Sequence, residues 1–170
     1  MNPLHERFAR VRTFIFDVDG VLTDGSVNAL ASGEQFRTFN IRDGYGIEQA
    51  LKAGYKIAIV SAGNQEGVRK RLEFLKIKDI FMGGPSDQKL NAYLGYLTRD
   101  AIAEDEVLYM GDDLPDWEIL ARPTLLSTCP ADAADEIQAV CDYISPKPGG
   151  RGAVRDVIEQ VMKAQGKWLR

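Results

Sequence analysis

Two aspartates one residue apart, Asp17 and Asp19, come directly after the apolar run Val11–Phe16 and precede a glycine, Gly20. In an open α/β sheet, ligands bind at the carboxyl ends of the strands, so these acids are placed where a ligand would lie. Paired carboxylates suit a hard cation and also acid–base chemistry. Taken alone, the pair is equally compatible with a solvated turn rich in Asp and Gly.

A second acidic cluster, Gly111-Asp112-Asp113-Leu114-Pro115-Asp116, follows the apolar run Val107–Met110 in the same strand–acid–turn order. The proline and the residues after it fit a helix start, where Asp113 and Asp116 could serve only as caps. Capping does not explain why two separate strands both end in acids, which would repel each other without a cation between them. Because the ligands are oxygens and the single histidine is His5, Mg²⁺ is favoured over Zn²⁺.

Two further residues would complete a phosphate site. Ser61 ends the apolar run Lys56–Val60, and the backbone N–H groups of Ala62-Gly63-Asn64 at the start of a helix can cradle an anion. Lys89 also begins a helix, where the macrodipole disfavours a cation unless its amine faces acids and phosphate. A solvated lysine is the alternative interpretation of Lys89.

Short β-rich runs alternate with amphipathic stretches, which predicts a Rossmann-like α/β fold with a parallel sheet and helices on both faces. The expected strands are 11–16, 56–60, 79–82 and 107–110, with weaker candidates at 124–127 and 142–144. The expected helices are 44–53, 65–75, 88–97, 116–121, 131–139 and 152–164. The runs 26–29 and 34–39 flank a turn at 31–33 and indicate a β-hairpin inserted after the first strand.

Length and composition favour one globular domain over residues 1–170, with the hairpin at about 24–40 and a C-terminal tail at about 146–170. A formal net charge of −4 argues against nucleic acid or an anionic membrane as a partner. No apolar stretch is long enough to span a membrane, and the first 12 residues lack the core of a signal peptide. Two cysteines make no disulfide framework, so we expect a reduced, cytoplasmic protein.

The ordered set Asp17-x-Asp19-Gly-Val-x-Thr23, Ser61, Lys89 and Gly111–Asp116 resembles the motifs of the haloacid dehalogenase superfamily of phosphatases. The resemblance covers most of the chain. It implies that Asp17 is a nucleophile forming an aspartyl-phosphate, and that Asp19 protonates the leaving oxygen and then activates water. Such a nucleophile splits hydrolysis into two easier steps.

The same resemblance implies the other roles at the site. Ser61 and Lys89 would hold the phosphoryl group, and the substrate would also be contacted by Thr23, Ala62 and Gly63. Mg²⁺ would be ligated by Asp17, Asp112 and the backbone carbonyl of Asp19. Asp113 and Asp116 would sit nearby in supporting roles.

The spacing between the motifs leaves no room for the cap domain that members of this superfamily usually carry. From Asp17 to Ser61 there are 44 positions, which a hairpin, a helix and a strand use up. From Ser61 to Lys89 there are 28, which a helix and a strand use up. Without a cap, the far end of a bound substrate stays open to water unless a neighbouring subunit covers it.

Three segments, 40–46, 111–116 and 148–155, look like those of the capless 3-deoxy-D-manno-octulosonate 8-phosphate phosphatases, which act in the synthesis of a lipopolysaccharide sugar. This resemblance implies a homotetramer assembled with help from the hairpin, and a Gly-Gly-Arg-Gly tail that lies over a neighbour's active site. Arg42 and Arg151 would then bind an acidic sugar phosphate, with Arg151 carried on a flexible arm. The alternatives are an ion pair between Arg42 and Asp43 and a plain surface loop at the tail.

The second motif departs from this family, which usually has Ser-Gly-Arg where this chain has Ser61-Ala62-Gly63. One expected contact is therefore missing, and a nine-carbon ulosonate 9-phosphate is the alternative substrate. A receiver domain also uses Asp, Lys and Mg²⁺, but the order of the motifs argues against it. A non-catalytic phosphatase-like oligomerisation module is disfavoured because Asp17, Asp19 and Asp112 are intact.

Overall fold

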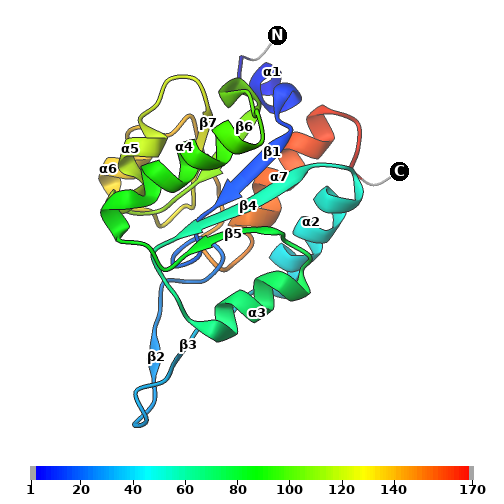
Figure 1. Cartoon of the computed structure of the whole chain (residues 1–170). Helices are drawn as coiled ribbons and strands as arrows, with labels where there is room; N and C mark the ends of the chain where they lie inside the picture. The colour runs from blue at the N-terminus through cyan, green and yellow to red at the C-terminus, as the bar shows by residue number, and fades with distance from the viewer. Residues whose placement is uncertain (1–2, 169–170) are drawn as a thin grey trace.

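Within residues 3–168, which the computed structural model describes, six parallel strands form a sheet in the order β5-β4-β1-β6-β7-β8 (Figure 1). They are β1 (Thr13–Phe16), β4 (Lys56–Ser61), β5 (Asp79–Met82), β6 (Val107–Met110), β7 (Leu126–Cys129) and β8 (Tyr143–Ile144). Phe16, the last residue of β1, lies opposite Ile59 of β4 and Met110 of β6. The strands that lead to Asp17 and Asp112 and the strand that ends at Ser61 are therefore neighbours, and their carboxyl ends meet at one edge of the sheet.

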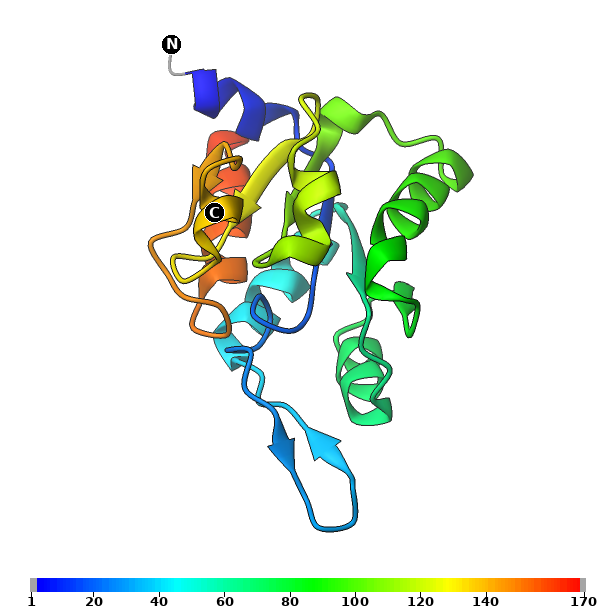
Figure 2. The ribbon, with the colours of Figure 1, turned by 90° about the vertical axis from the view of Figure 1, so that its left-hand side faces the viewer.

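Helices cover both faces of this sheet, as predicted (Figures 1 and 2). One face carries α1 (Pro3–Arg10), α2 (Ile41–Lys52), α3 (Glu66–Phe74) and α7 (Ala153–Ala164). The other carries α4 (Lys89–Arg99), α5 (Trp117–Leu120) and α6 (Asp135–Gln138). Short 3₁₀ turns occupy Ser86–Gln88, Glu104–Glu106 and Leu114–Asp116. Strand β1 serves both cores because its side chains alternate, with Phe14 and Phe16 on one side and Ile15 on the other.

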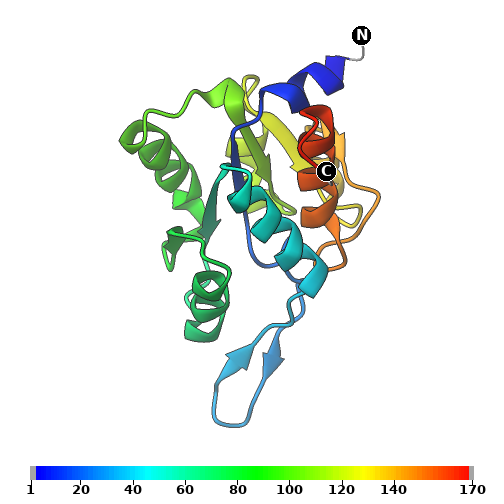
Figure 3. The same ribbon diagram turned by 90° about the vertical axis from the view of Figure 1, so that its right-hand side faces the viewer.

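The predicted hairpin consists of the antiparallel strands β2 (Asn28–Ala29) and β3 (Gln35–Phe36). It extends away from the body of the molecule at the end where β1 finishes (Figures 2 and 3). Three of its apolar side chains, Val27, Leu30 and Phe36, are about half exposed. The chain between β1 and β4 otherwise holds only α2, and α3, β5 and α4 fill the chain between β4 and β6, so no cap domain is inserted within residues 3–168.

Most element boundaries differ from the predicted ones by a few residues, and α6 is shorter than the predicted 131–139. Two of the differences have a clear local cause. Helix α1 was not expected, because its eight residues carry too short an apolar pattern, yet Phe8 is buried and packs edge-on against Tyr143. Helix α2 begins at Ile41 instead of Gly44, because the side chain of Asn40 accepts a hydrogen bond from the backbone N–H of Arg42. None of the helices within residues 3–168 is both long and apolar enough to cross a membrane.

The expectation of a flexible arm near the C-terminus is wrong for the glycine-rich segment. The backbone N–H of Gly150 donates to the carbonyl of Val21 at 2.9 Å, and a Cβ at Gly149 would overlap the carbonyl oxygen of Gly20. The segment therefore packs against the loop after β1 of its own chain. Helix α7 follows at once and is a core helix, with buried Ala153, Val154, Val157, Ile158, Val161 and Met162.

Candidate active site

The loop after β1 is built around Asp17 and Gly20. The Asp17 side chain is 8% exposed, and one of its oxygens accepts a hydrogen bond from the backbone N–H of Val18 at 2.6 Å. Gly20 has a φ of +79°, and a Cβ at this position would overlap the carboxylate of Asp112. Glycine is thus required here both for the left-handed turn and for the close approach of the second acidic cluster.

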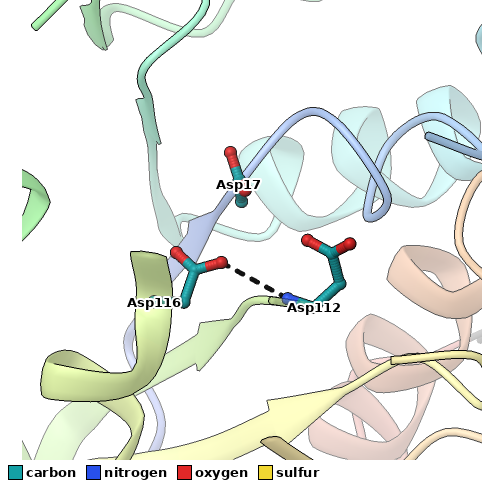
Figure 4. A group of neighbouring side chains, drawn as sticks. All are labelled: Asp17, Asp112 and Asp116. Atoms are coloured by element: carbon teal, nitrogen blue, oxygen red, sulfur yellow. Dashed lines mark hydrogen bonds between the residues drawn. The ribbon is translucent and has the colours of Figure 1, made fainter. Parts of the chain in front are cut away.

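Three carboxylates converge from this loop and from the turn after β6. Oxygens of Asp17, Asp112 and Asp116 lie within 4.8 Å of one another (Figure 4). Burial, and then the charge of Asp116, raise the pKa of Asp17 to about 8 and the pKa of Asp112 to about 7. Both shifts express the cost of holding like charges together away from water, a cost that a cation bound between them would remove. The all-oxygen donor set fits Mg²⁺.

Lys89, the first residue of α4, reaches into the same cluster. Its Nζ donates to Asp17 Oδ2 at 2.7 Å and to Asp116 Oδ1 at 2.9 Å, and its side chain is 6% exposed. Burial acts to lower the pKa of this amine, but the charges of Asp116 and Asp17 outweigh it and raise the pKa above its ordinary value. The lysine therefore faces the acids, as predicted, and is not solvated.

Asp116 forms hydrogen bonds with three residues of this cluster: Lys89, Asp112 and Tyr109. No pattern in the sequence predicts the contact with Tyr109. The Tyr109 hydroxyl donates to Asp116 Oδ1 at 2.7 Å. The backbone N–H of Asp112 donates to Asp116 Oδ2 at 3.3 Å, as Figure 4 shows. Asp116 and Tyr109 are both fully buried. Asp116 thus positions Lys89 and Asp112 at once and is not merely a helix cap.

Ser61 and the turn after β4 form the opposite wall of the pocket. Ser61 is 6% exposed, and its hydroxyl accepts a hydrogen bond from the backbone N–H of Gly63 at 3.3 Å. Together with Ala62, these residues line a cavity of about 280 Å³ that also contains the three aspartates and Lys89. A Cβ at Gly63 would lie 2.9 Å from Gln65 Oε1, so Gln65 fills the space above the glycine.

Asp19 lines the same cavity, but its carboxylate is not part of the three-acid group within the described residues. Its side chain is 40% exposed, and Oδ1 accepts a hydrogen bond from Nε of Arg37 at 3.0 Å. Arg37 belongs to the segment that returns from the hairpin. No spacing in the sequence predicts this contact, because it depends on the path of the segment that returns from β3 past the loop.

A comparison with models of protein families finds no match. A comparison with individual proteins finds the 3-deoxy-D-manno-octulosonate 8-phosphate phosphatase of Escherichia coli K12, which is 40% identical over 157 residues, or 92% of this chain and 82% of that protein. The chain belongs to this phosphatase family. The family lies within the haloacid dehalogenase superfamily, so the predicted family and fold are confirmed.

Solved structures of family members agree with this chain over nearly its whole length. The Yersinia pestis phosphatase superimposes with a TM-score of 0.93 at 35% identity, covering 98% of this chain and 88% of that one. The Moraxella catarrhalis phosphatase, solved in complex with magnesium, phosphate and a KDO molecule, gives 0.92 at 33% identity, covering 98% and 94%. This phosphatase family therefore includes a member whose structure holds the metal that the acidic cluster predicts.

Three predicted site residues, Thr23, Arg42 and Arg151, lie outside this cavity. Thr23 is fully buried, and its hydroxyl bonds to the backbone of Val18, Gly20 and Gly25, so it shapes the loop and does not face a ligand. Asp113 does line the cavity, and its carboxylate accepts a hydrogen bond from the backbone N–H of Leu114 at 2.8 Å, which caps the turn there. Arg42 and Arg151 line a separate pocket with Lys147 and Arg155. Within one chain, these two arginines do not reach the phosphate site.

Proposed function

We propose that this protein is a Mg²⁺-dependent phosphatase that hydrolyses 3-deoxy-D-manno-octulosonate 8-phosphate to the free sugar acid and phosphate through an aspartyl-phosphate. The observation that carries this proposal is the burial of Asp17 against Lys89 and beside Asp112, at the point where two parallel strands end. Such a cluster places a nucleophile, a fixed cation and an oxygen-ligand metal site around one position. Phosphoryl transfer depends mainly on this kind of positioning and charge neutralisation.

Each residue of the site has its own role in forming and hydrolysing the aspartyl-phosphate. A carboxylate oxygen of Asp17 attacks phosphorus while Lys89 and Ser61, with the backbone N–H groups of Ala62 and Gly63, hold the phosphoryl oxygens. Asp17, Asp112 and the backbone carbonyl of Asp19 would hold Mg²⁺, which would neutralise charge on the transferring group. Asp19 gives its proton to the sugar oxygen as the P–O bond breaks and then takes a proton from the water that attacks the aspartyl-phosphate.

Two observations bear on which sugar phosphate is the substrate: the substrates of the relatives, and the residue at position 63. The relatives named above act on, or were solved with, the eight-carbon acid, which favours a role in making a lipopolysaccharide sugar. Gly63, in place of the usual arginine, removes a cation from the pocket wall and leaves the space to the neutral amide of Gln65. This substitution is the reason to keep a nine-carbon ulosonate 9-phosphate as the second candidate.

Assembly belongs to the same proposal. The exposed apolar side chains of the hairpin and the open mouth of the pocket favour a homotetramer in which neighbouring subunits complete each active site. Arg42 and Arg151, which point elsewhere in their own chain, would then serve a neighbour's substrate. The net negative charge argues against nucleic-acid and anionic-membrane partners, and two free cysteines without a disulfide framework favour a reducing, cytoplasmic location.

A phosphate-release screen tests the proposal. The protein is incubated with Mg²⁺ and, in separate wells, the eight-carbon and nine-carbon ulosonate phosphates, other sugar phosphates and nucleotides. We expect the highest kcat/KM for the eight-carbon acid. A preference for the nine-carbon acid supports the second candidate, and no release from any phosphate monoester contradicts an enzymatic role.

A further inference from the structure

Arg37 is a buried cation that none of the motifs accounts for. Its side chain is 5% exposed, although Gln35, Phe36 and Thr38 around it are all exposed. Its guanidinium lies between two acceptors: Nε donates to Asp19 Oδ1 at 3.0 Å, and Nη1 donates to Gln35 Oε1 at 3.3 Å. The contact with Asp19 joins the hairpin segment to the catalytic loop, 18 residues earlier in the chain.

The Asp19 carboxylate depends on this contact for its orientation. Within residues 3–168, Arg37 is its one side-chain hydrogen-bond donor, whereas Asp17 is held by both Lys89 and the backbone of Val18. A carboxylate that is 40% exposed would otherwise rotate freely about its χ angles. With Oδ1 bound to Arg37, Oδ2 faces the second-motif turn, 3.7 Å from where a Cβ of Gly63 would lie.

We infer that Arg37 is a positioning residue for the reaction, which holds Asp19 so that its free oxygen, Oδ2, carries the proton to the leaving oxygen. This inference rests on the proposed function. In the first step, the bond between phosphorus and the sugar oxygen breaks, its electron pair stays on that oxygen, and the oxygen takes the proton of Asp19. At the same time the Asp17 oxygen forms its bond to phosphorus, so Arg37 gains and loses no atom and acts only through Asp19.

Substrates with different leaving groups distinguish a positioning role of Arg37 from a merely structural one. An alkyl phosphate needs the leaving oxygen to be protonated, whereas nitrophenolate leaves p-nitrophenyl phosphate without protonation. We expect Arg37→Gln to lower kcat for the sugar acid phosphate and for glycerol 2-phosphate by about tenfold to a hundredfold. For p-nitrophenyl phosphate the loss should be less than about threefold. Arg10→Gln, which changes an exposed arginine on α1, is the matched control.

A double variant tests whether Arg37 affects catalysis through Asp19. If Arg37 acts through Asp19, Asp19→Asn combined with Arg37→Gln is no slower on the alkyl phosphates than Asp19→Asn alone. Equal losses on alkyl and aryl phosphates, no loss at all, or a further loss in the double variant each overturns the inference. If the wild-type protein cleaves glycerol 2-phosphate but not the sugar acid phosphate, the proposed substrate is wrong, and the contrast between alkyl and aryl phosphates still decides the role of Arg37.

Discussion

At the scale of single residues, the site depends on one buried lysine among three acids. Lys89 contacts Asp17 and Asp116 directly, and without it the cluster would be a group of carboxylates held together away from water. A helix N-terminus is an unfavourable place for a cation, so its position is explained by the acids it faces. The same lysine thus contributes to folding and, in the proposed mechanism, to binding of the phosphoryl group.

Lys89→Met should reduce both the stability and the activity of the protein. Removing one partner of a buried ion pair leaves uncompensated charge, so we expect the free energy of unfolding in metal-free buffer to fall by about 3–5 kcal/mol. Phosphate release should be lost as well. Urea unfolding measures the first effect, with the exposed Lys78→Met as the control. An unchanged unfolding midpoint for Lys89→Met would contradict the network described here.

Asp43 gives a prediction about pH. It is buried at the start of α2, where Oδ1 accepts a hydrogen bond from the backbone N–H of Arg155 at 2.8 Å and Oδ2 has no partner within residues 3–168. It therefore braces α7 and forms no ion pair with Arg42, contrary to the alternative considered from the sequence. Burial raises the pKa of Asp43 above 3.8, against the opposing effect of backbone hydrogen bonds.

Because the folded state holds this proton more tightly than the unfolded state, the group adds stability as the pH falls through its folded pKa towards 3.8. We expect the stability of the wild type, relative to Asp43→Asn, to be greater at pH 4.5 than at pH 7. Urea unfolding of both proteins at the two pH values measures the difference. A relative stability that decreases on acidification contradicts the assigned direction of the shift.

The residues that sequence reasoning missed share a physical cause. Asp17, Ser61, Lys89 and Asp112 could be predicted to meet, because each follows or begins an element at the same edge of the sheet. Tyr109 and Arg37 bind their aspartates through side-chain contacts that depend on tertiary packing. A tyrosine within an apolar strand and an arginine beside an exposed hairpin carry no local signal of such a partner.

At the scale of elements, the strands and the C-terminal helix α7 were predictable, whereas the packing of the glycine-rich segment 148–152 was not. Short apolar runs followed by Gly, Ser or Asp match β1, β4, β5 and β6 within two residues at either end. The glycine-rich segment looked like a mobile arm by composition, but its glycines permit close packing against the loop after β1. Composition cannot separate a glycine kept for flexibility from one kept because a side chain would not fit.

Gly149→Ala tests this packing. A Cβ would overlap the carbonyl oxygen of Gly20, beside Asp19, so we expect a loss of about 1–3 kcal/mol in stability, together with reduced activity. The control is Gly95→Ala, an exposed position in α4 where a Cβ meets nothing within 4 Å. Alanine there should stabilise the helix by about 0.5–1 kcal/mol. Thermal unfolding of both variants should therefore give shifts of opposite sign.

At the scale of the whole molecule, almost all of the described chain forms the sheet, the helices and the hairpin. Helices, strands and the hairpin occupy the intervals between the motifs, so no cap domain is inserted within residues 3–168. In the proposed homotetramer, the half-exposed Val27, Leu30 and Phe36 of the hairpin would contact other subunits. Because the fold has no cap domain, the proposed function requires neighbouring subunits to cover the bound substrate.

Native mass spectrometry tests that assembly. We expect four chains in the wild-type particle and smaller species when Leu30 and Phe36 are both changed to Asp, because charge on this apolar surface opposes contact. Ser32→Asp, at the exposed tip of the hairpin, is the control and should remain tetrameric. Activity on the sugar acid phosphate should fall with the loss of assembly. A fully active monomer would contradict completion of the site by neighbouring subunits.

The most direct test of the central claim is to trap the phosphorylated protein during turnover. The wild-type protein is mixed with Mg²⁺ and 3-deoxy-D-manno-octulosonate 8-phosphate, quenched in acid within the first turnover, and digested for peptide mass spectrometry. We predict one phosphoryl group on Asp17 in the wild type and none in Asp17→Asn, which should fold but release no phosphate. Turnover by Asp17→Asn, or a phosphoryl group on another residue, would contradict the mechanism.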